Sequence, residues 1–149
     1  MRVRIKKTDQ RENEEVVIRC VDITSEVRDI YTYVQSRGTE IAGMADGKLC
    51  SFSLRDVCYF EALDEKVFAY TTKEVYEVKM RLYEVEEAYT MQHFTRCSKS
   101  IVLNLMQLEG ISPTLNGRFL AHMKNGEKIM ITRSYVPKLK AIITGKAEE

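Results

Sequence analysis

The histidines and cysteines are the side chains of this sequence best suited to metal binding or nucleophilic catalysis. There are two histidines, His93 and His122, and four cysteines that stand far apart along the chain: Cys20, Cys50, Cys58 and Cys97. No two cysteines form a C-x-x-C pair, and neither histidine stands at zinc-ligand spacing from a cysteine. We therefore expect no metal and no other cofactor. The cysteines are interpreted as small buried hydrophobes in a protein of a reducing compartment.

The motifs that mark the common classes of enzyme are missing from the sequence. It has no phosphate-binding glycine loop, no dinucleotide fingerprint and no G-x-S-x-G nucleophile elbow. His122 shares a predicted strand face with Arg118 and Lys124, so its imidazole should be exposed, and His93 falls in a predicted loop. The acidic residues within 84–87 are interpreted as the solvated side of a helix. The sequence therefore predicts a protein that is not an enzyme.

Length and composition indicate one globular domain, or one domain with a short extension. The chain has 149 residues, of which 44% are hydrophobic and 30% are charged, a balance typical of folded soluble proteins. No apolar run approaches the roughly 20 residues that cross a bilayer. The charged, alternating N-terminus does not have the pattern of a signal peptide. We therefore expect a cytoplasmic protein.

The net charge of +1 conceals an uneven distribution along the chain. Residues 1–40 are balanced, residues 41–92 carry six basic and ten acidic side chains, and residues 93–149 carry nine basic and four acidic ones. A basic C-terminal part suggests a polyanionic partner. Chance clustering of charges on solvated faces explains the distribution equally well, so charge alone does not decide.

The first forty residues predict a small β-β-α unit. Apolar and basic residues alternate over residues 1–7, and β-branched residues are frequent over 16–21, so both segments predict strands. A helix should follow, which Thr24 or Ser25 can cap and Gly38 can end. Its apolar residues recur at helical spacing: Val27, Ile30, Tyr31 and Val34.

Gly38 also marks the best domain boundary that the sequence offers. We assign residues 1–40 to an N-terminal extension for dimerisation or regulation, and residues 41–145 to the main domain. Asp46-Gly47, between two apolar runs, predicts a hairpin turn.

The main domain is predicted to be mainly β with short helices, of the α+β class. Its strands are expected at residues 41–44, 49–52, 57–63, 66–71, 73–78, 94–97, 101–103, 108–115, 118–124 and 128–132. Short helices are expected at residues 80–89 and from residue 133 to 143. Simple alternation along 57–63 should place Cys58 and Phe60 on one face and Val57, Tyr59 and Glu61 on the other.

Five motifs stand in a distinctive order along this domain. The first is Leu54 to Ala62, with the sequence LRDVCYFEA, and the second is Phe94 to Leu105, with the sequence FTRCSKSIVLNL. The other three are Asn116-Gly117-Arg118, Lys124-Asn125-Gly126-Glu127-Lys128 and Ile131-Thr132-Arg133-Ser134-Tyr135-Val136. This order resembles the LytTR family of DNA-binding domains. The resemblance runs from about Gly43 to Ile143, and residues 1–40 resemble the leader of compact, stand-alone members.

The resemblance implies an elongated, largely β fold that reads successive major grooves of DNA with loops. It assigns base contacts to Lys66, Lys99 and Arg133. It assigns phosphate contacts to seven further residues: Arg96, Ser98, Ser100, Arg118, Ser134, Lys138 and Lys140. The chemistry suits these roles, because an arginine can bind guanine O6 and N7 with two parallel bonds and serine hydroxyls can bind phosphate oxygens.

Several of these residues also allow a structural interpretation. Lys66 can be an ordinary hairpin-turn lysine, Lys99 a solvated loop charge, and Arg133 a residue at the start of a helix. Arg96 can point into a structural salt bridge instead of toward DNA. Asn104 is expected to hydrogen-bond the backbone at the end of a strand and not a base.

The function that follows from the resemblance is that of a bacterial-type transcription regulator which binds duplex DNA as a homodimer on repeated half-sites. The sequence has no receiver domain, so control by protein level, by a partner or by dimerisation through residues 1–40 is expected in place of a phosphorelay. Compact members of the family suggest a small membrane protein as that partner. The alternative is a β-rich protein-interaction module, an adaptor or anti-regulator without DNA affinity, which the acidic stretch 56–87 favours.

Overall fold

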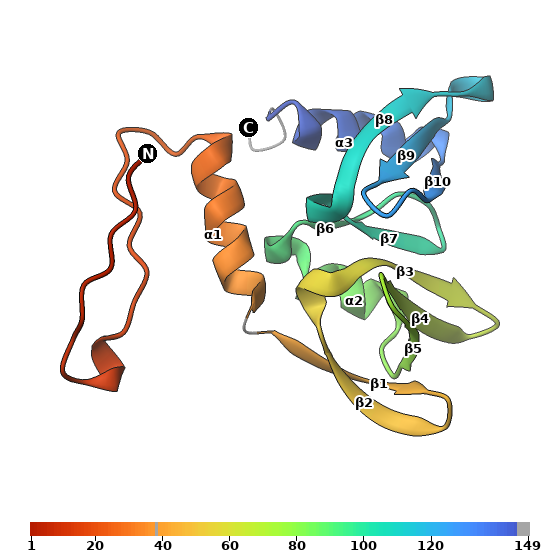
Figure 1. The fold of residues 1–149 in the computed structure, drawn as a ribbon. Helices are drawn as coiled ribbons and strands as arrows, with labels where there is room; N and C mark the ends of the chain where they lie inside the picture. The colour runs from red at the N-terminus through yellow and green to blue at the C-terminus, as the bar shows by residue number, and fades with distance from the viewer. Residues whose placement is uncertain (38, 146–149) are drawn as a thin grey trace.

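The computed structural model describes residues 1–37 and 39–145, and its body consists of two antiparallel sheets (Figure 1). The larger sheet has seven strands in the order β2-β1-β5-β4-β3-β7-β6. Their bounds are Glu40–Ala45 for β1, Lys48–Ser53 for β2, Val57–Leu63 for β3, Lys66–Thr71 for β4, Val75–Val78 for β5, Phe94–Arg96 for β6 and Ile101–Asn104 for β7. The smaller sheet has the order β10-β9-β8, with β8 at Leu108–Pro113, β9 at Phe119–Met123 and β10 at Lys128–Ile131.

Three α-helices accompany the sheets: α1 at Ser25–Arg37, α2 at Leu82–Ala88 and α3 at Val136–Ile143. Short 3-10 turns join the elements: η1 at Arg11–Asn13, η2 at Leu54–Asp56, η3 at Thr90–Gln92, η4 at Leu105–Gln107, η5 at Leu115–Gly117 and η6 at Arg133–Tyr135. The predicted class, mainly β with short helices, is confirmed. No helix within residues 1–37 and 39–145 is long and apolar enough to cross a membrane.

The hairpins form where the turn residues predict them. Asp46 and Gly47 both have positive φ, 50° and 75°, between β1 and β2. Asp64 and Glu65 have φ of 50° and 67° between β3 and β4. Glycine and aspartate tolerate this left-handed region at low cost, so Asp46-Gly47 specifies a tight turn.

A β-bulge in β3 changes which of its side chains face each of the two hydrophobic cores. The pairing of β3 with β4 shifts between Val57 and Tyr59, so Cys58 is an extra residue opposite the β4 register. As a result Val57 and Phe60 pack in the core beneath α2, whereas Cys58 and Tyr59 pack in the core shared with the smaller sheet and α3. The simple alternation expected for residues 57–63 is therefore wrong, because a bulge puts two consecutive side chains where the pleat would place one.

Polar contacts hold the turn between β9 and β10 against β3. The Tyr59 hydroxyl donates to Glu127 Oε2 at 3.0 Å, and Asn125 Nδ2 contacts Cys58 Sγ at 3.5 Å. Burial, together with the adjacent Glu127 carboxylate, raises the pKa of the Tyr59 phenol. The phenol therefore stays protonated and continues to donate at all physiological pH values. The hydrogen bond between Tyr59 and Glu127 therefore joins the smaller sheet to the larger one.

The N-terminal segment departs from the prediction. Within residues 1–24, all of which the structure describes, no strand forms, and the segment is extended apart from η1. The β-β part of the expected β-β-α unit is therefore wrong. Alternation alone does not make a strand, because an isolated two-stranded hairpin is at best marginal in water and needs a further strand or a helix on its apolar face.

The predicted helix after this segment is confirmed as α1. Thr24 caps it, since its Oγ1 accepts from Val27 N at 3.3 Å and its carbonyl accepts from Arg28 N at 3.0 Å. Thr32 is 2% exposed and its Oγ1 lies 3.3 Å from His93 Nε2, which joins α1 to the larger sheet's β6 side. Gly38, the predicted end of the helix, lies outside the described residues.

Asn104 provides a test of how β7 is joined to β3. Its side chain is 1% exposed, its Nδ2 donates to the Val57 carbonyl at 2.8 Å, and its Oδ1 accepts from Met106 N at 3.0 Å. The expectation that Asn104 bonds backbone is confirmed. Asn104→Ala should lower the free energy of unfolding by about 1–3 kcal/mol, because two buried backbone groups lose their partners.

Equilibrium unfolding in urea measures this change. Lys73→Ala, in the exposed turn between β4 and β5, is the matched control and should change stability by less than about 0.5 kcal/mol. Equal stability of the Asn104→Ala and Lys73→Ala variants would contradict the role given to Asn104.

Candidate nucleic-acid interface

Four connections meet along one edge of the molecule, at the right-hand side of Figure 1. Main-chain hydrogen bonds place three of them side by side. Ala62 N, near the end of β3, donates to the Ser100 carbonyl at 2.8 Å. Thr132 N, just after β10, donates to the Cys97 carbonyl at 3.0 Å. We call this the loop edge; it comprises residues 64–66, 97–100, 115–118 and 133–134.

The fourth connection, residues 115–118, contacts the rest of the loop edge through Arg133. Gly117 has a φ of +75°, and a Cβ built on it would lie 2.8 Å from Arg133 Cδ. The missing side chain at Gly117 therefore lets the aliphatic part of Arg133 lie directly on the turn before β9. Arg118 closes the same turn, since its Nε donates to the Leu115 carbonyl at 3.2 Å. The Asn116-Gly117-Arg118 motif and Arg133 are thus one local structure.

Lys99 and Arg133 are both exposed, as the resemblance requires of residues that read bases. Lys99 stands at the tip of the turn between β6 and β7, and Arg133 begins η6. Because Thr132 is bonded to Cys97, the two cations are carried by chain segments that are fixed to one another. Ser134, next to Arg133, is also exposed. The structure therefore brings these sequence-predicted residues together.

Lys66 lies on the same edge with a different charge environment. Its side chain is 60% exposed, and its Nζ lies 3.9 Å from Glu77 Oε1 on β5. The turn just before it is acidic, with Asp64 and Glu65 both exposed. Lys66 is therefore available to a ligand, but neighbouring carboxylates already offset part of its charge.

Ser98 and Ser100 shape the turn that carries Lys99. Ser98 is 8% exposed, and its Oγ accepts from Ser100 N at 3.2 Å and lies 3.4 Å from Ser100 Oγ. This is a local turn stabilised by a serine side chain. Ser98 was predicted to bind a phosphate, but in this structure its hydroxyl is directed into the turn. Ser100 is only half-buried and keeps the more accessible hydroxyl.

Arg96 is engaged within the protein. Its side chain is 17% exposed, its Nε lies 3.2 Å from Glu86 Oε1 on α2, and its Nη1 donates to the Lys99 carbonyl at 2.7 Å. The structure thus shows the salt bridge that the sequence left as an alternative to phosphate contact. Through it α2 braces the turn that presents Lys99.

Cys97, the first residue of this turn, is unreactive at neutral pH. It is fully buried, and burial raises the pKa of its thiol to about 12. A thiol that stays protonated is neither a nucleophile nor a metal ligand. Cys97 packs in the core with Leu103 and Ile131, as the sequence predicted, and Cys58 is buried too. For Cys20, which is exposed, the predicted burial is wrong, and Cys50 is only half-buried.

Two lysines of α3 extend the cationic surface beyond the turns. Lys138 is exposed in the first turn of the helix. Lys140 is also exposed, but its Nζ lies 4.6 Å from the centre of the Phe119 ring, a cation–π contact. Lys138 makes no such ring contact with the described residues, so it is the better suited of the two to bind a phosphate.

The loop edge and α1 lie at opposite ends of the same strands. Helix α1 contacts η2 and η3, which precede β3 and β6. The turns of the loop edge follow β3 and β6. Strand β3 has seven residues, which at about 3.3 Å per residue separate the two ends by about 20 Å. The N-terminal part of the chain therefore leaves the loop edge uncovered, as Figure 1 shows.

Sequence reasoning missed two features that position the site. The first is Glu86, which was assigned to the solvated side of a helix but holds Arg96. The sequence gives little indication of this contact, because the position of a glutamate on a helix does not show which strand its side chain faces. The second is the contact of Gly117 with Arg133, which joins two motifs that were recognised separately.

Comparison with known proteins agrees with this geometry. Residues 47–144 match the family model described as the LytTr DNA-binding domain. An uncharacterized HTH-type transcriptional regulator of Staphylococcus aureus (strain NCTC 8325 / PS 47) is 29% identical over 100 residues, which is 67% of this chain and 67% of that protein. A regulator of the same description from strain MRSA252 is 28% identical over the same length.

A solved structure shows the same fold. It is the LytTr DNA-binding domain of a Bacillus cereus protein described as a methyl-accepting/DNA response regulator, with a TM-score of 0.66 and 24% identity. The similarity covers 70% of this chain and 96% of that domain. These descriptions are of DNA-binding regulators and not of enzymes. Because the family model matches more than half of the chain, residues 47–144, the chain belongs to the LytTr DNA-binding domain family.

Proposed function

We propose that this protein is a transcription regulator that recognises specific sequences of duplex DNA with the turns of the loop edge. The observation that carries the proposal is that two exposed cations, Lys99 and Arg133, stand on turns joined by the main-chain bond between Thr132 and Cys97. Turns that are held in place lose little backbone freedom on binding, so the cations that they carry can be directed at base edges and not only at phosphates.

In this proposal Lys66, Lys99 and Arg133 contact bases. Phosphates are bound by the accessible polar residues around them: Ser100, Arg118, Ser134, Lys138 and Lys140. Arg96 and Ser98 act indirectly, because their polar groups are used to hold the Lys99 turn. The turns enter successive major grooves, each about 12 Å wide in B-DNA.

A selection of genomic fragments on the immobilised protein, followed by footprinting, tests the proposal. At near-physiological salt, fragments with a common sequence should be enriched and protected. Absence of any enriched sequence would contradict the proposal.

The proposal extends to partners and place of action. A homodimer would bind two repeated half-sites, and a small membrane protein would regulate it, as the resemblance suggests. Action on the chromosome implies a cytoplasmic location.

A second candidate function is a protein-interaction module without DNA affinity. The acidic turn formed by Asp64 and Glu65, directly beside Lys66, favours it. The two functions predict different salt dependence with a nonspecific duplex. A DNA-binding regulator should lose affinity steeply as salt rises, because phosphate contacts release counterions, whereas an adaptor should show no such slope.

Arg133→Ala should weaken binding to the selected site by about 1–3 kcal/mol and relax the preference at one base pair, because a two-bond contact to a base is lost. Titration of the site and of its single-base variants measures both effects. An affinity and a base preference equal to those of the unmodified protein would show that Arg133 does not read a base.

Lys138→Ala should weaken binding to all duplexes alike. A lost phosphate contact carries no sequence information, so the slope of log affinity against log salt should flatten by about one. Titrations at several salt concentrations measure the slope. A change in base preference at one position would contradict the assignment of Lys138 to a phosphate.

Glu86→Gln should weaken specific binding by about 1 kcal/mol, the upper range for a partly exposed ion pair, because Arg96 no longer holds the Lys99 turn firmly. Whether the affinity for DNA falls or rises distinguishes two roles of Arg96. Removing a negative charge near DNA would by electrostatics alone strengthen binding. Glu87→Gln, on the same helix, is the matched control and should leave affinity unchanged or slightly raised. Stronger binding by Glu86→Gln would argue that Arg96 contacts phosphate directly.

A further inference from the structure

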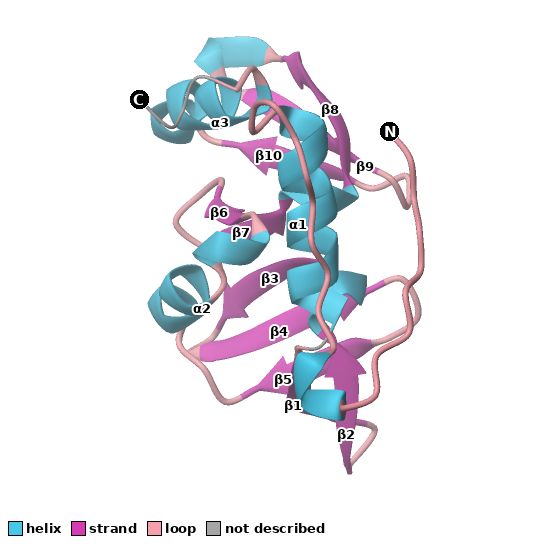
Figure 2. Cartoon of the chain, turned by 90° about the vertical axis from the view of Figure 1, so that its left-hand side faces the viewer, coloured by secondary structure: helices cyan, strands magenta, loops and turns pink. Residues whose placement is uncertain are grey.

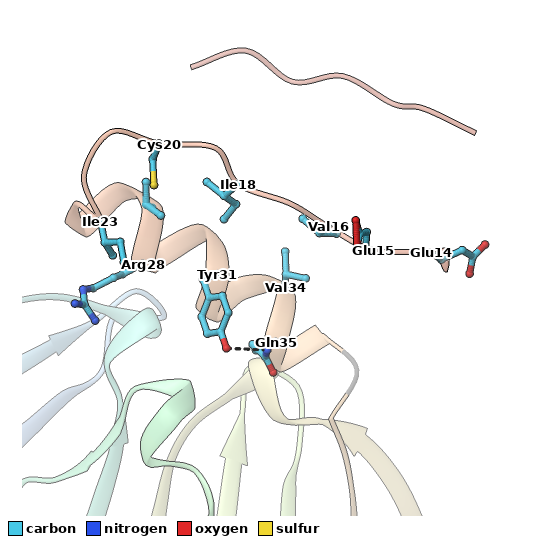
Figure 3. Close-up of a pocket in the computed structure, with 11 residues that line it drawn as sticks. Glu14, Glu15, Val16, Ile18, Cys20, Ile23, Arg28, Tyr31, Val34 and Gln35 are labelled. Atoms are coloured by element: carbon cyan, nitrogen blue, oxygen red, sulfur yellow. Dashed lines mark hydrogen bonds between the residues drawn. The ribbon is translucent and has the colours of Figure 1, made fainter. Parts of the chain in front are cut away.

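The N-terminal segment and α1 enclose an apolar groove that lies away from the loop edge. Residues 14–20 run along the exposed side of α1, as Figure 2 shows, and leave a groove of about 880 Å³ between the segment and the helix (Figure 3). Val16, Ile18 and Ile23 line it from the segment, and Tyr31 and Val34 line it from α1.

This groove is open to solvent in a single copy of the chain. Tyr31 is 49% exposed and Val34 is 39% exposed, although both belong to the apolar stripe predicted for the helix. A volume of this size falls in the upper part of the range of roughly 300–1,000 Å³ found for binding pockets. Contiguous exposed apolar surface of this kind marks an interaction site.

Residues 1–7 have the pattern of a ligand for such a groove. Val3 and Ile5 are 90% and 94% exposed, they alternate with Arg2, Arg4 and Lys6, and Lys7 follows at the end of the segment. In an extended chain this alternation places Val3 and Ile5 on one face. The groove is complementary in charge as well, because Glu14 and Glu15 lie at one of its ends (Figure 3).

The segment does not fill the groove of its own chain. After the turn η1, residues 14–20 pass next to α1, while the chain before the turn runs to one side of them, as Figure 2 shows. The apolar face of residues 1–7 and the groove that suits it are therefore both unfilled in one copy. A second copy can satisfy both at once.

We propose that two copies of this chain exchange their N-terminal segments, so that residues 1–7 of each copy occupy the groove between residues 14–20 and α1 of the other. The segments run antiparallel, with Lys6 and Lys7 beside Glu15 and Glu14. Ile5 then lies by Val16, and Val3 lies by Ile18. The contact is two-fold and self-complementary, as most homodimer interfaces are.

The number of residues available is sufficient for a stable interface. Such interfaces bury about 800 Å² per partner and use roughly 20–30 residues a side. Residues 1–24 together with the exposed face of α1 supply that number. Because the groove and the loop edge lie at opposite ends of the strands, the exchange neither uses nor blocks the loop edge. The inference therefore does not depend on DNA binding, and either can fail alone.

Sedimentation equilibrium of the full chain tests the exchange. The unmodified protein should be a dimer at micromolar concentration. Ile5→Asp should raise the dissociation constant at least about 100-fold, because each dimer carries the substitution twice and each loss of about 1.4 kcal/mol is a factor of ten. Val17→Asp is the matched control: Val17 is 63% exposed but does not line the groove, so the dimer should persist. A monomeric unmodified protein, or an equal effect of both substitutions, would overturn the proposal.

Disulfide formation between differently substituted copies tests the occupant of the groove. In a background with Cys20→Ser and Cys50→Ser, a chain with Val3→Cys is mixed with a chain with Ile18→Cys. Oxidation should give a covalent product of twice the 17.3 kDa chain mass that contains one copy of each. If the mixture gives no such product, while a single chain with both substitutions closes a disulfide without a change in mass, the segment fills its own groove and the exchange is wrong.

Discussion

Two main-chain hydrogen bonds fix the turn of residues 97–100 between the two sheets, and the loop edge depends on them. On one side the Ser100 carbonyl accepts from Ala62 N in the larger sheet, and on the other the Cys97 carbonyl accepts from Thr132 N at the end of β10. A turn bonded on both sides has little freedom to move. The positions of Lys99 and Arg133 relative to each other therefore follow from the pairing of the sheets and not from the flexible side chains alone.

Side-chain contacts add to the main-chain bonds that position Lys99 and Arg133. Arg96, held by Glu86, donates to the Lys99 carbonyl, and Gly117 makes room for the stem of Arg133. Both contacts place a cation on a supported backbone. The bulge at Cys58 places two consecutive side chains, Cys58 and Tyr59, in the core that β3 shares with the smaller sheet, whose last strand leads into Thr132 and Arg133. The fold thus brings Lys99 and Arg133, which are distant in sequence, to one edge of the molecule.

The sequence predicts elements well where the information is local. Asp46-Gly47 specifies its hairpin through positive φ, and the spacing of apolar residues in 80–89 identifies α2. Prediction fails where a partner is distant in sequence. The strands expected at residues 1–7 and 16–21 have no further strand among the described residues to complete a sheet with them, and alternation does not reveal this. Arg96 has the residue type of a phosphate ligand, but its partner Glu86 belongs to another element.

For the candidate site, the motifs predict which residues come together, and the structure adds how they are held. Lys99, Arg133 and Lys66 do share one edge, although Glu77 near Lys66 could not be inferred from spacing. We propose that this edge is the surface that meets DNA. Amide chemical-shift mapping of the labelled protein with a selected duplex tests it most directly. The largest shifts should fall at residues 64–66, 97–100, 115–118 and 133–134, with α1 unaffected. Shifts concentrated on α1, or no shifts with any duplex, would contradict it.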